Sequence, residues 1–264
     1  MAGWVIGWLA FLGSGVYRRR FLDNARRAGF GLADMWPAVG HAGKLIAELP
    51  RLWLGAPVPT TLLGFEHIDA ALAAGKGIVA LTPHLGCFEV AAQAYAQRYA
   101  DAGRPMTVLY RPPRKAWLAR LMEGARERPG LLTAPTTLGG VKSMLKALKK
   151  GDAVGLLPDQ VPPDGMGVWA SFFGEPAYTM TLSARLVQPT GACILLASCE
   201  RLSWGRGFVV RYEPWPAALG ALPTDPDLAA AQVNTAMQGL IARYPAQYLW
   251  GYARYKAPRH QVAP

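Results

Sequence analysis

From residue 68 onward, the hydrophobic pattern alternates between short apolar runs and longer segments with helical periodicity. Apolar runs of roughly four to eight residues between turn-forming residues are typical of buried strands, and longer periodic segments are typical of helices. The pattern predicts strands at 78–82, 106–110, 131–134, 153–157, 192–199 and 208–212, and helices at 89–99, 115–128, 139–150, 181–188 and 227–244. This alternation predicts an α/β fold: a single domain with a mixed, mostly parallel sheet flanked by helices.

The N-terminal stretch differs from the rest of the chain. Residues 1–17 carry no charged side chain, and three arginines follow directly at 18–20. The apolar run is shorter than the roughly 20 residues that span a bilayer. We therefore expect an N-terminal membrane-binding helix in one leaflet, with the arginines at anionic headgroups on the cytoplasmic side; a buried first helix is the alternative. This divides the chain into a membrane-anchoring segment, 1–30, and a main domain, 31–264. Within the latter, residues 32–59 are predicted to be helical with breaks at the prolines.

The composition is that of a protein with a large core and a basic surface. Of the 264 residues, 52% are hydrophobic and 17% charged, which excludes a disordered or coiled-coil chain. The net charge of +11 favours an anionic partner: nucleic acid, acidic lipid or acidic protein. The sequence has no zinc-finger spacing, no ribonucleoprotein motif and no basic region with heptads, so we expect no nucleic-acid partner.

The cysteines indicate neither a disulfide framework nor a metal site. Cys87, Cys193 and Cys199 are too few for such a framework and lack the spacing of zinc ligands. A reducing compartment fits this usage, and no metal or bound cofactor is expected.

His84 is the strongest candidate for chemistry among the four histidines. It follows the apolar strand predicted at 78–82 and precedes a helix, so it lies at the carboxyl end of a strand, where α/β sheets present functional side chains. Glu89 comes five residues later and could return toward the imidazole in the first helical turn. The pair could then act as a general base with its orienting carboxylate, or form a structural ion pair.

Several segments from His84 onward resemble, in order, the blocks of one enzyme superfamily. Residues 82–89, TPHLGCFE, resemble the H-x-x-x-x-D/E motif of the glycerolipid acyltransferases, in the form with Glu found in the bacterial lipid A late acyltransferases, the lauroyl and myristoyl transferases. The later blocks of that family are similar to VLYRP at 108–112, VKSMLKALKKGD at 141–152, LPDQ at 157–160, FFG at 172–174, YPAQYLW at 244–250 and RYK at 254–256. Cys87 stands where many members carry Asn.

The resemblance implies transfer of a fatty acyl chain from acyl carrier protein, as a thioester co-substrate, to a hydroxyl of a lipid A precursor. It implies the cytoplasmic face of the cell inner membrane as the location and a membrane lipid as the acceptor. His84 would remove the hydroxyl proton during attack on the thioester carbonyl, and Glu89 would hold and polarise His84. Residues 31–264 would then be the acyltransferase domain.

The resemblance also implies substrate-binding roles for Arg126, Arg111, Asp159 and Gln160. Arg126 stands where the family has a basic residue needed for activity, and a guanidinium suits bidentate contact with a phosphate. Arg111 is a second candidate for that contact. Asp159, next to Gln160, ends an apolar strand and could orient an arginine or bind the acceptor. The structural alternatives are a charged helix end for Arg126 and a turn for Asp159.

Lys142, Lys146, Lys149 and Lys150 recur at spacings of three or four and therefore share roughly one side of a helix. They could form a docking strip for the acidic carrier protein, or simply a solvated face.

Three other functions compete with this one. The same chemistry could act on another acceptor, such as a glycolipid, an ornithine lipid or a polyene-type lipid. A non-catalytic, basic, membrane-peripheral binding protein would tolerate replacement of His84 and Glu89. A hydrolase is disfavoured because there is no G-x-S-x-G elbow and no second histidine in the pattern beside Cys87.

Overall fold

The structure is a computed structural model that describes residues 1–110 and 128–258. Almost all of the helix predicted at 115–128 therefore lies outside the described residues, as do Arg111 and Arg126.

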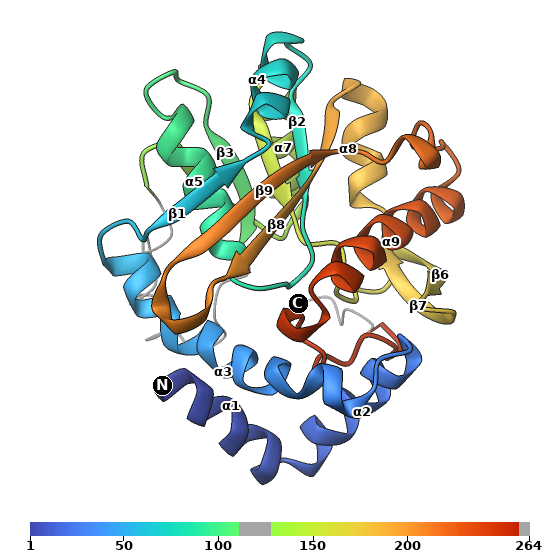
Figure 1. Ribbon diagram of the computed structural model, residues 1–264. Helices are drawn as coiled ribbons and strands as arrows, with labels where there is room; N and C mark the ends of the chain where they lie inside the picture. Colours follow the sequence, from blue (N-terminus) through green and yellow to red (C-terminus); the bar gives the residue numbers. More distant parts are fainter. Residues whose placement is uncertain (111–127, 259–264) are drawn as a thin grey trace.

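A seven-stranded sheet forms the centre of the described chain (Figure 1), in the order β1-β9-β8-β2-β5-β3-β4. The strands are β1 Thr60–Leu63, β2 Ile78–Leu81, β3 Met106–Tyr110, β4 Leu131–Pro135, β5 Ala153–Leu156, β8 Cys193–Arg201 and β9 Phe208–Pro214. Neighbouring strands are parallel except β8 and β9, which are antiparallel. The predicted α/β domain with a mixed, mostly parallel sheet is confirmed.

Helices cover both faces of the sheet. The central strand β2 is buried at all four positions, as expected for a parallel strand between two helical layers. Ile78 and Ala80 of this strand join a hydrophobic cluster with α4 (Phe65–Ala73) and α5 (Phe88–Tyr99). Val79 and Leu81 join a second cluster, with α7 (Leu138–Lys149), α8 (Leu182–Thr190) and α9 (Pro226–Arg243).

Local capping explains where the predicted helices begin and end. The Thr137 side chain accepts a hydrogen bond from the Gly140 amide at the start of α7, and Gly151, with φ +82°, follows the end of that helix. At α9, the Asp225 carboxylate accepts bonds from two amides of the first turn, and Pro226 occupies a position that needs no N–H donor. The predicted boundaries therefore lie close to the observed ones.

The N-terminal region forms three helices: α1 (Ala2–Gly13), α2 (Gly15–Arg27) and α3 (Leu32–Leu54). α1 packs closely along α3 through glycines; a Cβ atom on Gly7 would lie 2.1 Å from the Val39 carbonyl oxygen. Its Phe11 side chain joins the core cluster on the α9 face of the sheet. α1 is therefore a packed helix with one exposed side, and its binding to a membrane stays a prediction.

The predicted breaks at the prolines of the third helix are wrong. α3 continues through Pro37 and Pro50. The buried side chains Met35, Ala38 and Val39 hold the helix beside Pro37 against the core, and this packing outweighs the lost backbone hydrogen bond. None of the helices in the described part of the chain is long and apolar enough to cross a membrane.

Several short elements were not predicted. They are β1, α4, the hairpin β6 (Gly167–Phe172) and β7 (Glu175–Met180), and the 3-10 helices η1 (Ser203–Gly205), η2 (Ala217–Leu219) and η3 (Pro245–Gln247). The hairpin turns at Phe173 and Gly174, both with positive φ, which is the backbone that a two-residue hairpin loop needs.

Candidate functional site

Strand register brings His84 and Asp159 together. β2 and β5 are adjacent and parallel, and Leu81 pairs with Leu156 at their carboxyl ends. His84 and Asp159 each follow their paired leucine by three residues, so the two loops place them side by side. The chain leaves β2 toward α5 on one face and reaches α8 on the other face after β5. This is a topological switch point, where open α/β sheets bind their ligands.

Asp159 contacts His84 twice. Its Oδ1 lies 2.7 Å from the imidazole Nδ1, and its Oδ2 accepts the backbone N–H of His84 at 2.9 Å. The carboxylate is buried, whereas the His84 side chain is 17% exposed. The pair therefore has an inner, fixed member and an outer member that can meet a substrate.

The surroundings of Asp159 keep it ionised. Burial alone would raise its pKa, but the charge and the two hydrogen bonds of His84, with the charge of Arg254, hold the pKa below its ordinary value. Burial, followed by the charge of Asp159 and a hydrogen bond with it, raises the pKa of Tyr248 well above its usual range. An ionised carboxylate accepts hydrogen bonds only, so Nδ1 of His84 carries a proton.

With the proton on Nδ1, the other ring nitrogen is the basic one. Nε2 of His84 lies 3.0 Å from the side-chain Nε2 of Gln160, and the amide can only donate in that contact. The Phe88 ring packs edge-on against the imidazole, with centroids 4.9 Å apart. Gln160 therefore marks the position from which a substrate hydroxyl would reach the base.

Glu89 has a different contact from the one expected. It lies in the first turn of α5, and the Trp53 indole N–H is 3.4 Å from its Oε2. The carboxylate on Nδ1 of His84 is Asp159, which sequence analysis had assigned to substrate binding. The catalytic role of Glu89 stays a prediction, beside the orienting role that this geometry gives to Asp159.

The C-terminal segment holds the loop that carries His84. Leu249 donates its backbone N–H to the His84 carbonyl at 3.1 Å, and Leu85 forms an antiparallel bridge with Tyr248. The Tyr252 hydroxyl accepts the amide of Val161, directly after Gln160. The segment YPAQYLW, one of the later blocks of the resemblance, thus supports the site rather than lying apart from it.

Arg254 contributes to the same site through its charge and through its contacts with β7. It is buried, and it donates to the Tyr178 carbonyl and to the Thr179 hydroxyl, each at 2.7 Å. Its charge is one of the causes that lower the pKa of Asp159.

The remaining candidates are two arginines and one cysteine. Arg126 and Arg111 lie outside the described residues, so their predicted phosphate contacts stay predictions. Cys87 is fully buried, and burial raises the pKa of its thiol, which makes it a poor nucleophile. In the described ranges, no group of three or more His, Cys, Asp or Glu side chains is arranged to hold a metal ion.

This geometry defines a class of protein: an α/β protein whose His–Asp pair presents a basic imidazole nitrogen at the carboxyl ends of parallel strands. The family model described as bacterial lipid A biosynthesis acyltransferase matches residues 48–257. The chain belongs to this family, and membership supports acyl transfer in glycolipid biosynthesis as its chemistry.

Curated relatives agree with this class. The chain is 27% identical to the lipid A biosynthesis lauroyltransferase of Escherichia coli (strain K12), covering 90% of this chain and 72% of the relative. It is 28% identical to the palmitoleoyltransferase of the same strain, covering 73% and 60%. It is 29% identical to the phosphatidylinositol mannoside acyltransferase of Mycobacterium tuberculosis (strain H37Rv), covering 86% and 63%. The chain thus spans less than two thirds of the length of the latter two.

Both members of the central pair could be identified from the sequence, but their pairing could not. Asp159 follows a strand just as His84 does, and this shared position was the available signal. What was lacking was the strand order, because two carboxyl ends meet only if their strands are neighbours in the sheet. No local sequence pattern predicted that Arg254 and Tyr248 act on Asp159; the family resemblance was the one pointer to their segments.

Proposed function

We propose that this protein transfers a fatty acyl chain from a thioester donor to a hydroxyl of a membrane glycolipid, with His84 as the general base. The observation that carries the proposal is the ionised Asp159 on Nδ1 of His84, which leaves Nε2 as a base. A hydroxyl is a weak nucleophile at neutral pH, so removal of its proton during attack is the help this reaction needs.

In the proposed step, His84 first accepts the hydroxyl proton and then donates it to the leaving group. The acceptor hydroxyl takes the place of the Gln160 amide at Nε2, and its oxygen bonds to the thioester carbonyl carbon as the proton moves to Nε2. The tetrahedral intermediate then collapses, the carbon–sulfur bond breaks, and the departing sulfur takes the proton from His84. Asp159 stabilises the imidazolium between the two transfers and needs no proton of its own.

The oxygen of the tetrahedral intermediate needs hydrogen-bond donors that are already in place. The start of α5 follows His84, and the first N–H groups of a helix lack the carbonyl partner one turn earlier. The Val90 N–H already donates to the Cys87 carbonyl at 2.9 Å. The Phe88 N–H, or a guanidinium such as that of Arg111 or Arg126, would supply the donors.

A lipid A precursor is the first candidate acceptor, because the family and two of the relatives above carry lipid A in their names. Another membrane glycolipid is the second candidate, favoured by the relative named as a phosphatidylinositol mannoside acyltransferase. Acyl carrier protein is the proposed thioester carrier, and the cytoplasmic face of the inner membrane is the proposed location.

The side of the molecule that we propose for membrane contact is α1 with the following arginines. Val5, Leu9 and Leu12 of α1 are more than half exposed, and an exposed basic run follows at residues 18–20. α1 lies outermost in the layer of N-terminal helices beneath the sheet (Figure 1). Apolar side chains would enter the lipid there while the guanidinium groups meet anionic headgroups.

The test measures acyl transfer from a panel of acyl carrier protein thioesters to a tetra-acylated lipid A precursor and to a phosphatidylinositol mannoside. We expect wild-type protein to acylate one of them and His84→Ala to lose at least about a hundredfold in kcat/KM. Transfer to the mannoside alone would select the second acceptor. Equal rates in wild type and His84→Ala would overturn the general-base mechanism.

A further inference from the structure

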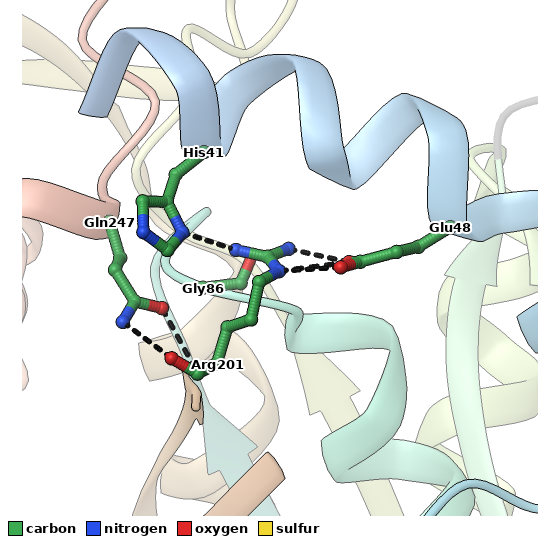
Figure 2. Close-up of polar contacts among 5 residues, drawn as sticks. All are labelled: His41, Glu48, Gly86, Arg201 and Gln247. Carbon is green, nitrogen blue, oxygen red and sulfur yellow. Dashed lines mark hydrogen bonds and ion pairs between the residues drawn. The ribbon is translucent and has the colours of Figure 1, made fainter. Parts of the chain in front are cut away.

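Arg201 is a buried cation next to the loop that carries His84, but not in contact with His84 itself. It is the last residue of β8, the strand beside β2, and its side chain extends toward α3 (Figure 2). Nε and Nη2 contact the Glu48 carboxylate, with N–O distances of 2.7 to 3.0 Å. Nη1 lies 2.9 Å from Nδ1 of His41, and Nη2 lies 3.3 Å from the Gly86 carbonyl oxygen.

His41 acts as an acceptor in this cluster. A guanidinium only donates, so Nδ1 of His41 has no proton and the ring is neutral. Burial and the charges of Arg201 and Lys44 lower the pKa of His41 to about 3, in agreement with that assignment. The guanidinium thus joins two side chains of α3 to one carbonyl of the loop after β2.

Gly86 is fixed from both sides. Its N–H donates to the Gln247 carbonyl at 2.9 Å, and its own carbonyl accepts from Arg201. The Gln247 side chain in turn pairs with the backbone N–H and carbonyl of Arg201, at 2.8 and 3.0 Å. Gly86 has φ +58°, and a Cβ there would lie 1.8 Å from the Cys199 carbonyl oxygen. The backbone conformation of the loop is therefore closely restricted where it passes the end of β8.

We propose that Arg201 is a positioning residue for acyl transfer, which holds the Gly86 peptide and thereby sets where the His84 imidazole meets the acceptor hydroxyl. The kinetic part of this inference rests on the function proposed above. Gly86 is two residues from His84, so a shift of its peptide moves the base directly. A displacement of about 1 Å in a reacting group can cost roughly a hundredfold in rate.

The arrangement also assigns a role to the contact with α3. Glu48 accepts from Nε and Nη2 of the guanidinium and His41 accepts from Nη1, so the orientation of the guanidinium depends on the position of this helix. The loop with His84 is thus tied to the N-terminal layer as well as to the sheet.

The kinetic test compares Arg201→Met, Arg201→Lys and the control Arg243→Met. Arg243 pairs with Glu213 on the α9 face of the sheet and is not part of this cluster. We expect kcat of Arg201→Met to fall about 10- to 100-fold, with KM of both substrates within about threefold of wild type. Arg201→Lys keeps the charge but not the forked arrangement of guanidinium N–H donors, so its kcat should lie between those of Arg201→Met and wild type. Arg243→Met should match wild type.

A second measurement needs no substrate. Amide hydrogen exchange over residues 82–90 should become faster in Arg201→Met than in wild type, and should not change in Arg243→Met, while both variants unfold cooperatively. If wild-type protein shows no acyl transfer, the proposed function fails and exchange still decides the positioning inference.

Three outcomes would overturn the inference. One is a folded Arg201→Met protein with wild-type kcat and wild-type exchange over residues 82–90. Another applies if Arg201→Met does not fold: an Arg201→Lys protein that matches wild type in both measurements would show that the contacts of the forked guanidinium are not needed. A rise in KM without a fall in kcat would also contradict it, because that pattern indicates lost substrate binding rather than a displaced base.

Discussion

At the residue scale, the chemistry depends on which nitrogen of His84 carries the proton. Asp159 accepts at Nδ1, so Nε2 keeps its lone pair. Asp159→Asn offers an amide whose N–H can face Nδ1, which would shift the proton to Nε2 and remove the base. We expect this variant to lose at least about a hundredfold in kcat/KM.

The matched variant is Glu89→Gln, which changes the other carboxylate and leaves the contact of His84 with Asp159 in place. Nitrogen-15 NMR of the imidazole distinguishes the two ring nitrogens. We expect a proton on Nδ1 in wild type and in Glu89→Gln, and on Nε2 in Asp159→Asn. A tautomer that responds to Glu89→Gln but not to Asp159→Asn would assign the orienting role to Glu89 instead.

At the element scale, the link between α3 and the sheet should make stability depend on pH. The pKa of His41 is about 3 in the folded protein, against roughly 6.5 for an unperturbed histidine. Between these values the unfolded chain binds a proton that the native protein does not, so the free energy of unfolding rises with pH. This contribution is complete above about pH 6.5 and is lost as the pH falls toward 3.

His41→Asn isolates this effect, because an amide oxygen can still accept from Arg201 but does not titrate. The free energy of unfolding, measured with urea between about pH 4.5 and 6.5, should rise more steeply with pH in wild type than in the variant. The two slopes should differ by up to roughly 1.4 kcal/mol per pH unit. The charge of Lys44 also acts on His41, and Glu48 contacts the same guanidinium as His41 does; both side chains remain in the variant. Equal slopes would mean that His41 is protonated in the folded protein.

The lysines of α7 allow a second prediction at this scale. α7 follows the carboxyl end of β4, which lies on the same side of the sheet as the carboxyl end of β2 and His84. It ends where β5 begins, on the side of the amino ends of these strands. Lys142 is therefore nearer the site than Lys149, and both are exposed. If an acidic carrier protein docks near the site, Lys142→Glu should raise KM for the thioester about fivefold or more, and Lys149→Glu less.

Added salt should reduce the difference between these two variants, because exposed charges are screened. The same charge change at both positions controls for net charge. An equal effect of Lys142→Glu and Lys149→Glu would place the donor elsewhere.

Elements with their own local signals could be predicted from sequence. β3 was predicted at its observed bounds, because an apolar run between polar turns needs no tertiary information. β1 was not predicted: its TTLL sequence is half polar and largely exposed, and pairing with β9 makes it a strand. The same limit applies to α3, where packing carries the helix through prolines that local rules treat as breaks. The pairing of His84 with Asp159 likewise depends on strand order, which no local pattern encodes.

At the scale of the whole molecule, the N-terminal helices and the site both lie near the carboxyl ends of the central parallel strands. α2 is tied to the C-terminal segment by Asn24, which donates to the carbonyls of Trp250 and Tyr252 at 2.6 and 2.7 Å. α3 is tied to the loop of His84 through Arg201. A membrane that meets the outer side of α1 would therefore lie on the side of the molecule where a lipid acceptor is needed.

This arrangement predicts how the protein binds vesicles. Leu9 on α1 is 65% exposed, and Leu228 on α9 is 60% exposed. Leu9→Asn removes an apolar side chain from the proposed membrane side, and burial of a leucine contributes roughly 1.5 to 3 kcal/mol. We expect co-sedimentation with phosphatidylglycerol-containing vesicles to weaken about tenfold or more in Leu9→Asn. Leu228→Asn, an equal change elsewhere, should bind like wild type.

The arginines after α1 add an electrostatic component, worth about 1 kcal/mol for each basic residue near an anionic surface. Binding should therefore fall on neutral phosphatidylcholine vesicles and with rising salt. Leu9→Asn should weaken binding to both kinds of vesicle by a similar factor, because the apolar contribution does not depend on lipid charge. If Leu9→Asn and Leu228→Asn both bind like wild type, α1 does not face the lipid, and its exposed side must serve another contact.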